Sequence, residues 1–275
     1  MTMQDDRGRH GWAGHGTRMG LGLAACVLSG LVGCASFDDF NFKKMNFEVF
    51  RDPDNPLEVI RNSKDGNLRA RALACLTEPQ AHGGSQQEQE VVVNLLVYSA
   101  ANESQPSCRV AAITSLRKFK DPRAVEGLKD AYYKANTFGA QQAAVIRSHA
   151  LSALGDTGSP AAIDVLVRVL KEPPVEGPDE DRQQKLNERI VAARALGHFK
   201  HYQATSALVE ILRTERTPEL VTPAHESLVE ATGKKIPPDA QAWTEFLQNP
   251  NSTKTVAPDV TPIDKMMKLV GGGGL

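Results

Sequence analysis

The amino-acid sequence predicts an all-α protein, an α-solenoid of about five stacked helical hairpins. Three observations support this fold class: a residue pattern recurs about every 40 residues, each copy contains two runs with helical apolar spacing, and turn residues separate the runs. The 275 residues are 41% hydrophobic and 24% charged, with a formal net charge of -1. This balance argues against a wholly disordered chain, an obligate nucleic-acid binder and a polytopic membrane protein.

The repeated pattern is Arg-x2-Ala-x2-(Ala or Ser)-Leu-x7-Ala-x3-Leu, and it occurs without a gap in copies that begin at Arg109, Arg147 and Arg189. Half a copy precedes them from Arg69, and a degenerate copy follows from Val221. The leucines that anchor the five units lie 40, 38, 42 and 32 residues apart; they are Leu76, Leu116, Leu154, Leu196 and Leu228. One hairpin cannot cover its apolar stripe alone, so we expect neighbouring units to stack.

The unit that begins at Arg147 shows why each copy forms two helices. Residues 147–154 have apolar side chains at helical spacing, and the turn residues 155–160 (GDTGSP) then stop the helix. Glycine there supplies a left-handed C-cap, and Ser159 is expected to cap the next helix just before Pro160. The second run carries an apolar stripe at helical spacing: Ala162, Ile163, Leu166, Val169 and Leu170.

This pattern resembles the HEAT repeat, particularly the HEAT-like type named after phycobilisome lyases. The resemblance covers about Leu57 to Leu247 and implies two helices per repeat. It implies little about activity, because function depends on sites added to a fold. Two kinds of enzyme are associated with such repeats. One is the phycobilin lyases, linked to this chain by the repeat name alone. The other is deoxyhypusine hydroxylase, which holds two irons with repeated His-Glu dyads.

The histidines do not fit that diiron enzyme. The chain has one such dyad, His225-Glu226, where a diiron site requires several. His198 and His201 have the spacing of metal ligands, but they lie at a predicted helix end without nearby cysteines or carboxylates in the sequence. We also find no Ser/His/Asp arrangement and no phosphate-binding glycine loop. The sequence therefore predicts no catalytic residue, no cofactor and no metal.

The first 33 residues resemble a bacterial lipoprotein signal peptide. A basic leader precedes Leu21–Gly33, a run of 13 residues without a charge. That run is too short to span a bilayer, which takes about 20 apolar residues. Leu31–Cys34 (LVGC) resembles the lipobox, which implies that Cys34 is lipidated. The protein would then be exported and membrane-anchored, facing the periplasm or the cell exterior. The alternative is a short buried helix with an incidental cysteine.

These patterns divide the chain into four parts. Residues 1–33 are the signal peptide, 34–55 a tether, 56–248 the HEAT-like repeat domain and 249–275 a disordered tail. The tether region is rich in phenylalanine, with five of the nine in residues 37–50. Within the repeat domain, we expect Asn55-Pro56 to start a short first helix. Pro237-Pro238-Asp239 is expected to start a last helix over 240–248, with Trp243 covering the final layer. Residues 79–89 and the acidic stretch 172–182 are expected to be loops.

The outward positions of the second helices are the candidate partner-binding surface, on the concave face that solenoids usually use for docking. By register they are Glu126, Asp130, Tyr133, Asp164, Arg168, Lys171, Ser206, Glu210 and Arg213. Their charges alternate in sign, and Asp164 and Arg168 have the spacing of an ion pair within one helix. A solvated face with paired ions is the alternative to a docking groove.

The repeated arginines and the two remaining cysteines receive structural interpretations. Each arginine lies one helical turn before a buried alanine, and in this family it usually packs its stem on the next repeat and binds turn carbonyls or acids. A row of anion-binding sites is the alternative. The register places Cys75 and Cys108 about 10 Å apart along neighbouring helices, so we predict two thiols and no disulfide.

The sequence predicts a lipid-anchored, non-enzymatic scaffold or adaptor at the cell envelope. Its expected partners are a protein on the concave face and the membrane through Cys34. Nucleic acid is not expected, because the chain is exported and lacks aromatic residues interleaved with basic ones. Two alternatives stay open: a lyase-like enzyme of the phycobilisome type, and an envelope-structural protein without a discrete ligand.

Overall fold

The computed structural model describes residues 55–250, which all belong to one compact unit. The predicted signal peptide, the predicted lipidation site Cys34, all but the last residue of the tether and most of the tail lie outside the described residues. Within 55–250 the chain is helical, without strands. None of these helices combines the length and the hydropathy needed to cross a membrane.

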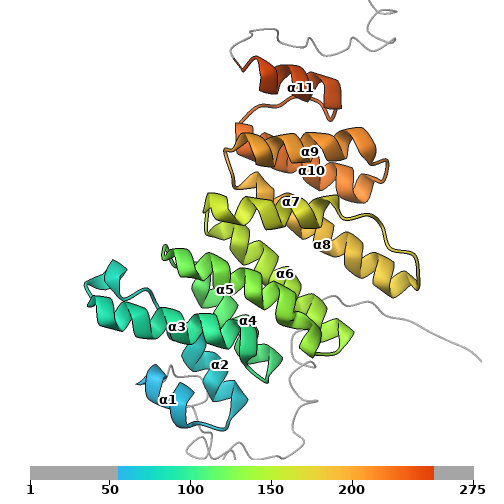
Figure 1. Cartoon of the computed structure of the whole chain (residues 1–275). Helices are drawn as coiled ribbons and strands as arrows, with labels where there is room; N and C mark the ends of the chain where they lie inside the picture. Colours follow the sequence, from blue (N-terminus) through green and yellow to red (C-terminus); the bar gives the residue numbers. More distant parts are fainter. Residues whose placement is uncertain (1–54, 251–275) are drawn as a thin grey trace, which may run out of the picture. The chain divides into compact units, whose positions relative to one another are not determined.

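Eleven α-helices and three short 3-10 helices make up the described part (Figure 1). In chain order the α-helices are α1 (Pro56–Asn62), α2 (Gly66–Cys75), α3 (Gln86–Asn102), α4 (Pro106–Leu116), α5 (Pro122–Tyr133), α6 (Ala140–Asp156), α7 (Ile163–Lys171), α8 (Asp179–Gly197), α9 (Tyr202–Thr214), α10 (Pro218–Thr232) and α11 (Ala240–Gln248). The 3-10 helices are η4 (Gln80–His82), η5 (Lys134–Thr137) and η6 (Pro160–Ala162).

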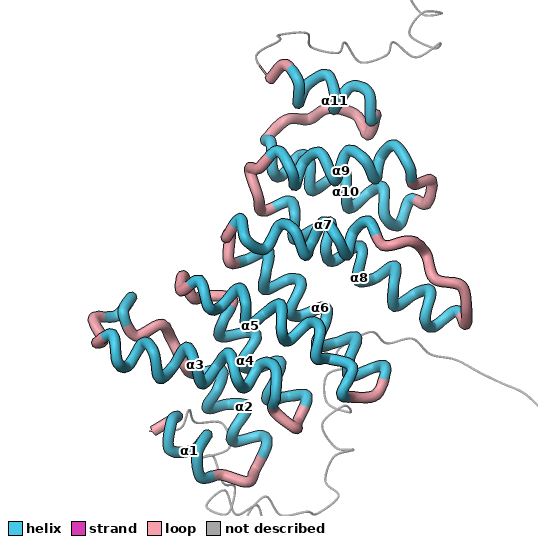
Figure 2. The backbone as a smooth tube through the Cα atoms, viewed as in Figure 1, coloured by secondary structure: helices cyan, strands magenta, loops and turns pink. Residues whose placement is uncertain are grey.

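The helices form two layers of stacked elements (Figure 2). The first helices of the units, α2, α4, α6, α8 and α10, pack on one another in succession. In the second layer α3 packs on α5, α7 on α9 and α9 on α11. Each second helix from α3 to α9 also packs on the first helix of the following unit, more extensively than on its own partner. This confirms an all-α solenoid of five stacked hairpins, preceded by α1.

The repeated residues form the core between the layers. The anchoring leucines Leu116, Leu154, Leu196 and Leu228 are fully buried, and so are the alanines one turn before them. Burial of each leucine side chain contributes about 1.5–3 kcal/mol to folding. Small residues let the first helices approach closely: a Cβ atom added at Gly155 of α6 would lie 2.8 Å from the Cα atom of Ala195 in α8.

The ends of the helices follow the capping residues in the sequence, with some shifts. Asn55 and Asp239 cap α1 and α11 as predicted, and Trp243 of α11 is fully buried over the last layer. Gly158 has a left-handed φ of 63° at the predicted turn. The Ser159 side chain, however, makes no capping hydrogen bond: the chain continues into η6, and α7 begins at Ile163.

Both predicted loops are shorter in the structure than the sequence suggested. Residues 79–89 contain η4, and α3 already begins at Gln86 behind a capping box formed by Ser85 and Glu88. Residues 172–182 end in the first turn of α8, which begins at Asp179. The acidic composition of residues 172–182 predicted a loop. Acidic side chains also stabilise the N-terminus of a helix, so the same composition favours this early helix start.

Candidate protein-interaction surface

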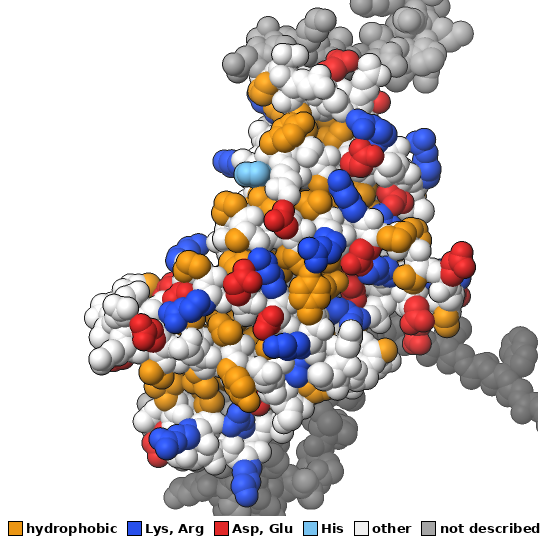
Figure 3. Space-filling model, viewed as in Figure 1, with side chains coloured by type: hydrophobic (Ala, Val, Ile, Leu, Met, Phe, Trp, Pro, Cys, Tyr) orange, Lys and Arg blue, Asp and Glu red, His pale blue; other side chains and the backbone are white. Residues whose placement is uncertain are grey.

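The predicted docking residues lie on the outward side of α5, α7 and α9. Their helices bury the opposite stripe, which includes Leu128, Leu166 and Leu208, so residues half a turn away point to solvent. Most of the predicted residues are exposed, while Ser206 and Glu210 are half-buried. Figure 3 shows acidic and basic side chains interspersed with hydrophobic ones over these helices. We call this surface the second-helix face.

Polar contacts link neighbouring helices of the second-helix face. The Arg168 Nη1 atom of α7 donates a hydrogen bond to the Tyr133 hydroxyl of α5 at 3.0 Å. The Gln203 Nε2 atom of α9 donates to Asp164 Oδ1 of α7 at 2.6 Å. The expected pair between Asp164 and Arg168 is therefore replaced by bonds to the units on either side. Arg213 continues the series, because its Nη2 atom donates to the Thr244 hydroxyl of α11 at 3.3 Å.

Three ion pairs on this face lie within single helices or at their ends. Lys129 pairs with Glu126 at 2.9 Å, Lys134 with Asp130 at 3.0 Å, and Arg213 with Glu210 at 2.9 Å. Exposed pairs of this kind contribute only about 0.2–1 kcal/mol each. A binding partner can therefore break one of these ion pairs and form its own at a small cost in free energy.

The repeated arginines lie inside the solenoid, where their guanidinium groups bind carbonyl and carboxylate groups of the protein itself. The Arg189 Nε atom donates to the Leu170 carbonyl at 2.9 Å, and its Nη2 atom pairs with the Glu215 carboxylate. The Arg109 Nε atom donates to the Glu103 carbonyl at 2.8 Å. Each arginine thus binds carbonyl groups or acids of adjoining helices and turns, as the structural interpretation of the arginines predicted.

The corresponding Arg147 belongs to a buried polar cluster with Glu188 and Tyr132. The Arg147 Nε atom donates to Glu188 Oε1 at 2.6 Å, and the Tyr132 hydroxyl donates to Glu188 Oε2 at 3.3 Å. Burial, and then the Glu188 charge, raise the pKa of Tyr132 well above its usual range. The cluster lines a hollow of about 490 Å³ beside the α7–α8 loop, where Lys185 pairs with Glu172. The basic groups of this hollow are therefore already paired with carboxylates.

Sequence reasoning did not single out Glu188, although its position offered a signal. It immediately precedes the repeat arginine Arg189, and α8 carries it to the neighbouring arginine Arg147 of α6. An acid that ends up only 4% exposed beside a repeated arginine is a candidate ion-pair partner. The pairing itself depends on how α6 and α8 stack.

The histidines have structural neighbours that the sequence did not reveal. His198 Nδ1 lies 3.5 Å from Asp156 Oδ1, and His198 Nε2 lies 3.8 Å from Glu230 Oε1. No carboxylate lies near His198 in the sequence, but stacking brings these two acids to it from α6 and α10. His225 Nε2 lies 2.6 Å from the Ile236 carbonyl oxygen. In residues 55–250, no three His, Cys, Asp or Glu side chains are grouped so that they could hold a metal ion.

The two cysteines of the repeat domain are thiols, as the register predicted. No disulfide joins Cys75 and Cys108. The Cys108 sulfur donates to the Gly66 carbonyl at 3.3 Å, and burial raises the pKa of the Cys108 thiol.

Comparison with known families agrees with this architecture. Residues 109–133 and 146–172 match the family model of the PBS lyase HEAT-like repeat, and these segments fall within the consecutive hairpins α4–α5 and α6–α7. No curated protein matches the chain. The described part of the protein is an α-solenoid, and two of its hairpins match the HEAT-like repeat.

Proposed function

We propose that this protein is a non-enzymatic scaffold that binds a protein partner through the second-helix face while Cys34 anchors it to a membrane of the cell envelope. The observation that carries the proposal is the series of bonds between units on that face, from Tyr133 through Arg168 and from Asp164 through Gln203. Neighbouring repeats are thereby joined into one continuous surface, the kind of surface that solenoids use for binding.

The chemistry of this face suits a protein partner. It combines both signs of charge with an exposed aromatic side chain, Tyr133, and tyrosine and arginine are enriched where proteins bind one another. The hollow beside the α7–α8 loop favours the same reading over a lyase-like enzyme, because Arg147 and Lys185 are each bound to a glutamate of the chain.

Crosslinking in intact cells tests the scaffold function. The full-length protein is crosslinked and purified, and its adducts are compared between the native chain and the variants Arg168→Glu and Arg213→Glu. We expect both variants to lose a shared adduct, because each places an acid where the partner meets a guanidinium. The control is Arg194→Glu, which reverses an exposed charge on α8 in the other layer. Loss of the adduct in the control as well, or its persistence in both test variants, would contradict the proposal.

Metabolic labelling with a fatty-acid analogue tests the anchor separately. The native chain should take up label and the Cys34→Ser variant should not, because the thiol is the acylated group. Label that persists in Cys34→Ser would reject the lipid anchor while leaving the docking proposal intact.

A further inference from the structure

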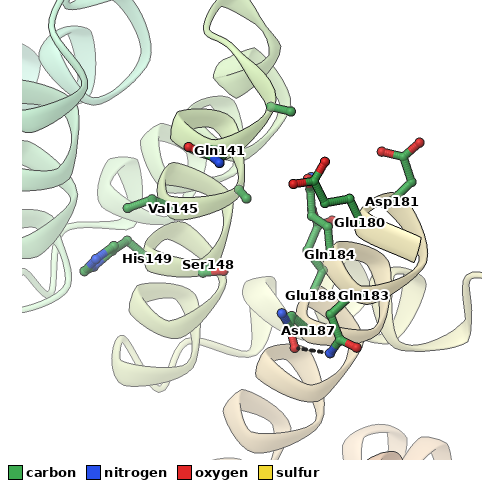
Figure 4. A pocket seen from close by; sticks show the side chains of 12 residues that line it. Gln141, Val145, Ser148, His149, Glu180, Asp181, Gln183, Gln184, Asn187 and Glu188 are labelled. Atoms are coloured by element: carbon green, nitrogen blue, oxygen red, sulfur yellow. Dashed lines mark hydrogen bonds between the residues drawn. The ribbon is translucent and has the colours of Figure 1, made fainter. Parts of the chain in front are cut away.

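A groove separates the N-terminal halves of α6 and α8, on a different part of the solenoid from the second-helix face (Figure 4). It encloses about 460 Å³. The α6 side contributes Ala140, Ala144 and Val145 to its lining, and the α8 side contributes Glu180, Asp181 and Gln184. The α6 side also contributes Gln141, Ser148 and His149, so this wall combines an apolar part with polar side chains, and the other wall is polar and acidic.

The sequence explains why the two helices leave this space. The first ten residues of α8, 179–188, contain a single aliphatic side chain, Leu186. The facing half of α6, residues 140–146, consists of alanine, valine and isoleucine apart from two glutamines. The C-terminal halves, by contrast, meet closely at Gly155 and Ala195. The groove thus lies where an apolar half-helix meets a polar one that cannot cover it.

The uncovered apolar wall is unusual for a surface position. Val145 is 51% exposed in the N-terminal half of α6, next to the small Ala144. Water-exposed apolar area costs about 25 cal/mol per Å², and such surface often marks a site where another molecule binds.

Apart from His149, no basic side chain lines the groove to balance its acidic wall. Within residues 55–250 no ion pair or side-chain hydrogen bond is found for Glu180 or Asp181. Both stabilise the N-terminus of α8 through the helix dipole, yet that interaction leaves their carboxylates facing solvent at the groove. The arginines and the lysine on these parts of α6 and α8 are held by other acids: Arg147 by Glu188, Arg182 by Asp179 and Lys185 by Glu172.

We propose that this groove binds a basic amphipathic helix of a partner protein. The apolar side of that helix would pack on Ala144 and Val145, and its lysines or arginines would meet Glu180 and Asp181. An amphipathic helix laid into an apolar groove is a common mode of peptide recognition, and opposite charges along one edge fix its direction. The inference rests on the proposed scaffold function, since it adds a second docking site of defined charge.

Site-specific photo-crosslinking in the full-length protein tests this proposal. A photoreactive amino acid replaces Val145, and a second version carries it at Tyr202, an exposed position on α9. We expect an adduct at position 145 that differs from any adduct at 202. Mass spectrometry should show that the crosslinked peptide has a net positive charge and apolar residues at steps of three and four.

Charge variants supply the decisive comparison. With Glu180→Lys and Asp181→Lys combined, the adduct should fall by about fivefold or more, because two attractive contacts become repulsive. Glu180→Gln with Asp181→Asn removes the negative charges without adding positive ones and should give a smaller loss. The matched control is Glu219→Lys with Glu226→Lys on α10, which should leave the adduct unchanged.

Several outcomes would overturn the groove proposal. They are an absent adduct at 145, an adduct unaffected by the Glu180 and Asp181 variants, and a crosslinked peptide that is neutral or acidic or that comes from residues 251–275 of the chain itself. The second-helix face is tested independently. Arg168→Glu should abolish the adduct formed with that face and leave the adduct at position 145 unchanged.

Discussion

Removal of the Glu188 carboxylate tests how the repeat arginines stabilise the solenoid. Glu188→Ala would leave the Arg147 guanidinium, whose side chain is 13% exposed, without its buried carboxylate and Tyr132 without its acceptor. Breaking a buried ion pair from one side costs about 3–5 kcal/mol. Arg147 retains a bond to Asn136, so we expect the lower end, a loss of about 3 kcal/mol in the free energy of unfolding.

The paired substitution gives the sharper result. Replacing both partners, Arg147→Met with Glu188→Leu, removes the charges together and fills their space with apolar groups, which is often nearly neutral. The single variants Arg147→Met and Glu188→Leu complete the cycle. The double variant should lie within about 1 kcal/mol of the native protein, giving a coupling energy of about 2 kcal/mol or more.

Urea unfolding at pH 7, followed by circular dichroism on the purified protein, measures both effects. Glu226→Ala on α10 serves as a control, since an exposed substitution should change stability by less than about 0.5 kcal/mol. The reasoning would be refuted if Glu188→Ala cost less than about 1 kcal/mol, or if the double variant lost as much as the two single variants together.

Three further predictions concern the packing, the caps and the thiols. Gly155→Ala should destabilise the protein by about 1–3 kcal/mol in the same assay despite alanine's better helix propensity, because the new methyl group meets α8; an unchanged midpoint would refute this. Asp121 caps α5, and hydrogen bonds from Arg123 lower its pKa from 3.8 to about 2. The stabilisation by the ionised Asp121 carboxylate is therefore complete above pH 3.8 and is lost as the pH falls towards 2. Asp121→Asn should flatten the pH dependence of the free energy of unfolding in that interval. An identical acid transition in both proteins would contradict this prediction. In a Cys75→Ser background, the buried Cys108 thiol should react with maleimide only after unfolding, and fast labelling of the native protein would argue against its burial.

Much of the repeat architecture could be predicted because its signals are local and periodic. The Arg147 and Arg189 copies carry buried residues at helical steps, and a single hairpin has no means of covering that stripe except by stacking. The first and last helices were also predictable, since Asn55-Pro56 and Asp239 are short-range capping signals. Helix starts hidden in polar stretches, as at Asp179, were missed because such residues suit both a loop and a helix terminus.

The candidate surfaces could be predicted only in part. Register alone placed Tyr133 and Arg168 outward, because positions along one helix fix which residues share a face. It did not provide their hydrogen bond, since that depends on the distance between two stacked helices. The groove beside Val145 was missed for the same reason. An apolar half-helix is predicted to be buried, and only the structure shows that a polar half-helix faces it.

The order of residues along the chain thus determined the helices, their buried sides and their sequence of stacking, because each depends on spacings within one or two turns. The tertiary structure decided which side chains from separate units meet, such as Glu188 with Arg147 and His198 with Asp156 and Glu230. These meetings depend on the rotation and separation of neighbouring helices. Those quantities arise from the packing of many small side chains together, and no single local motif encodes them.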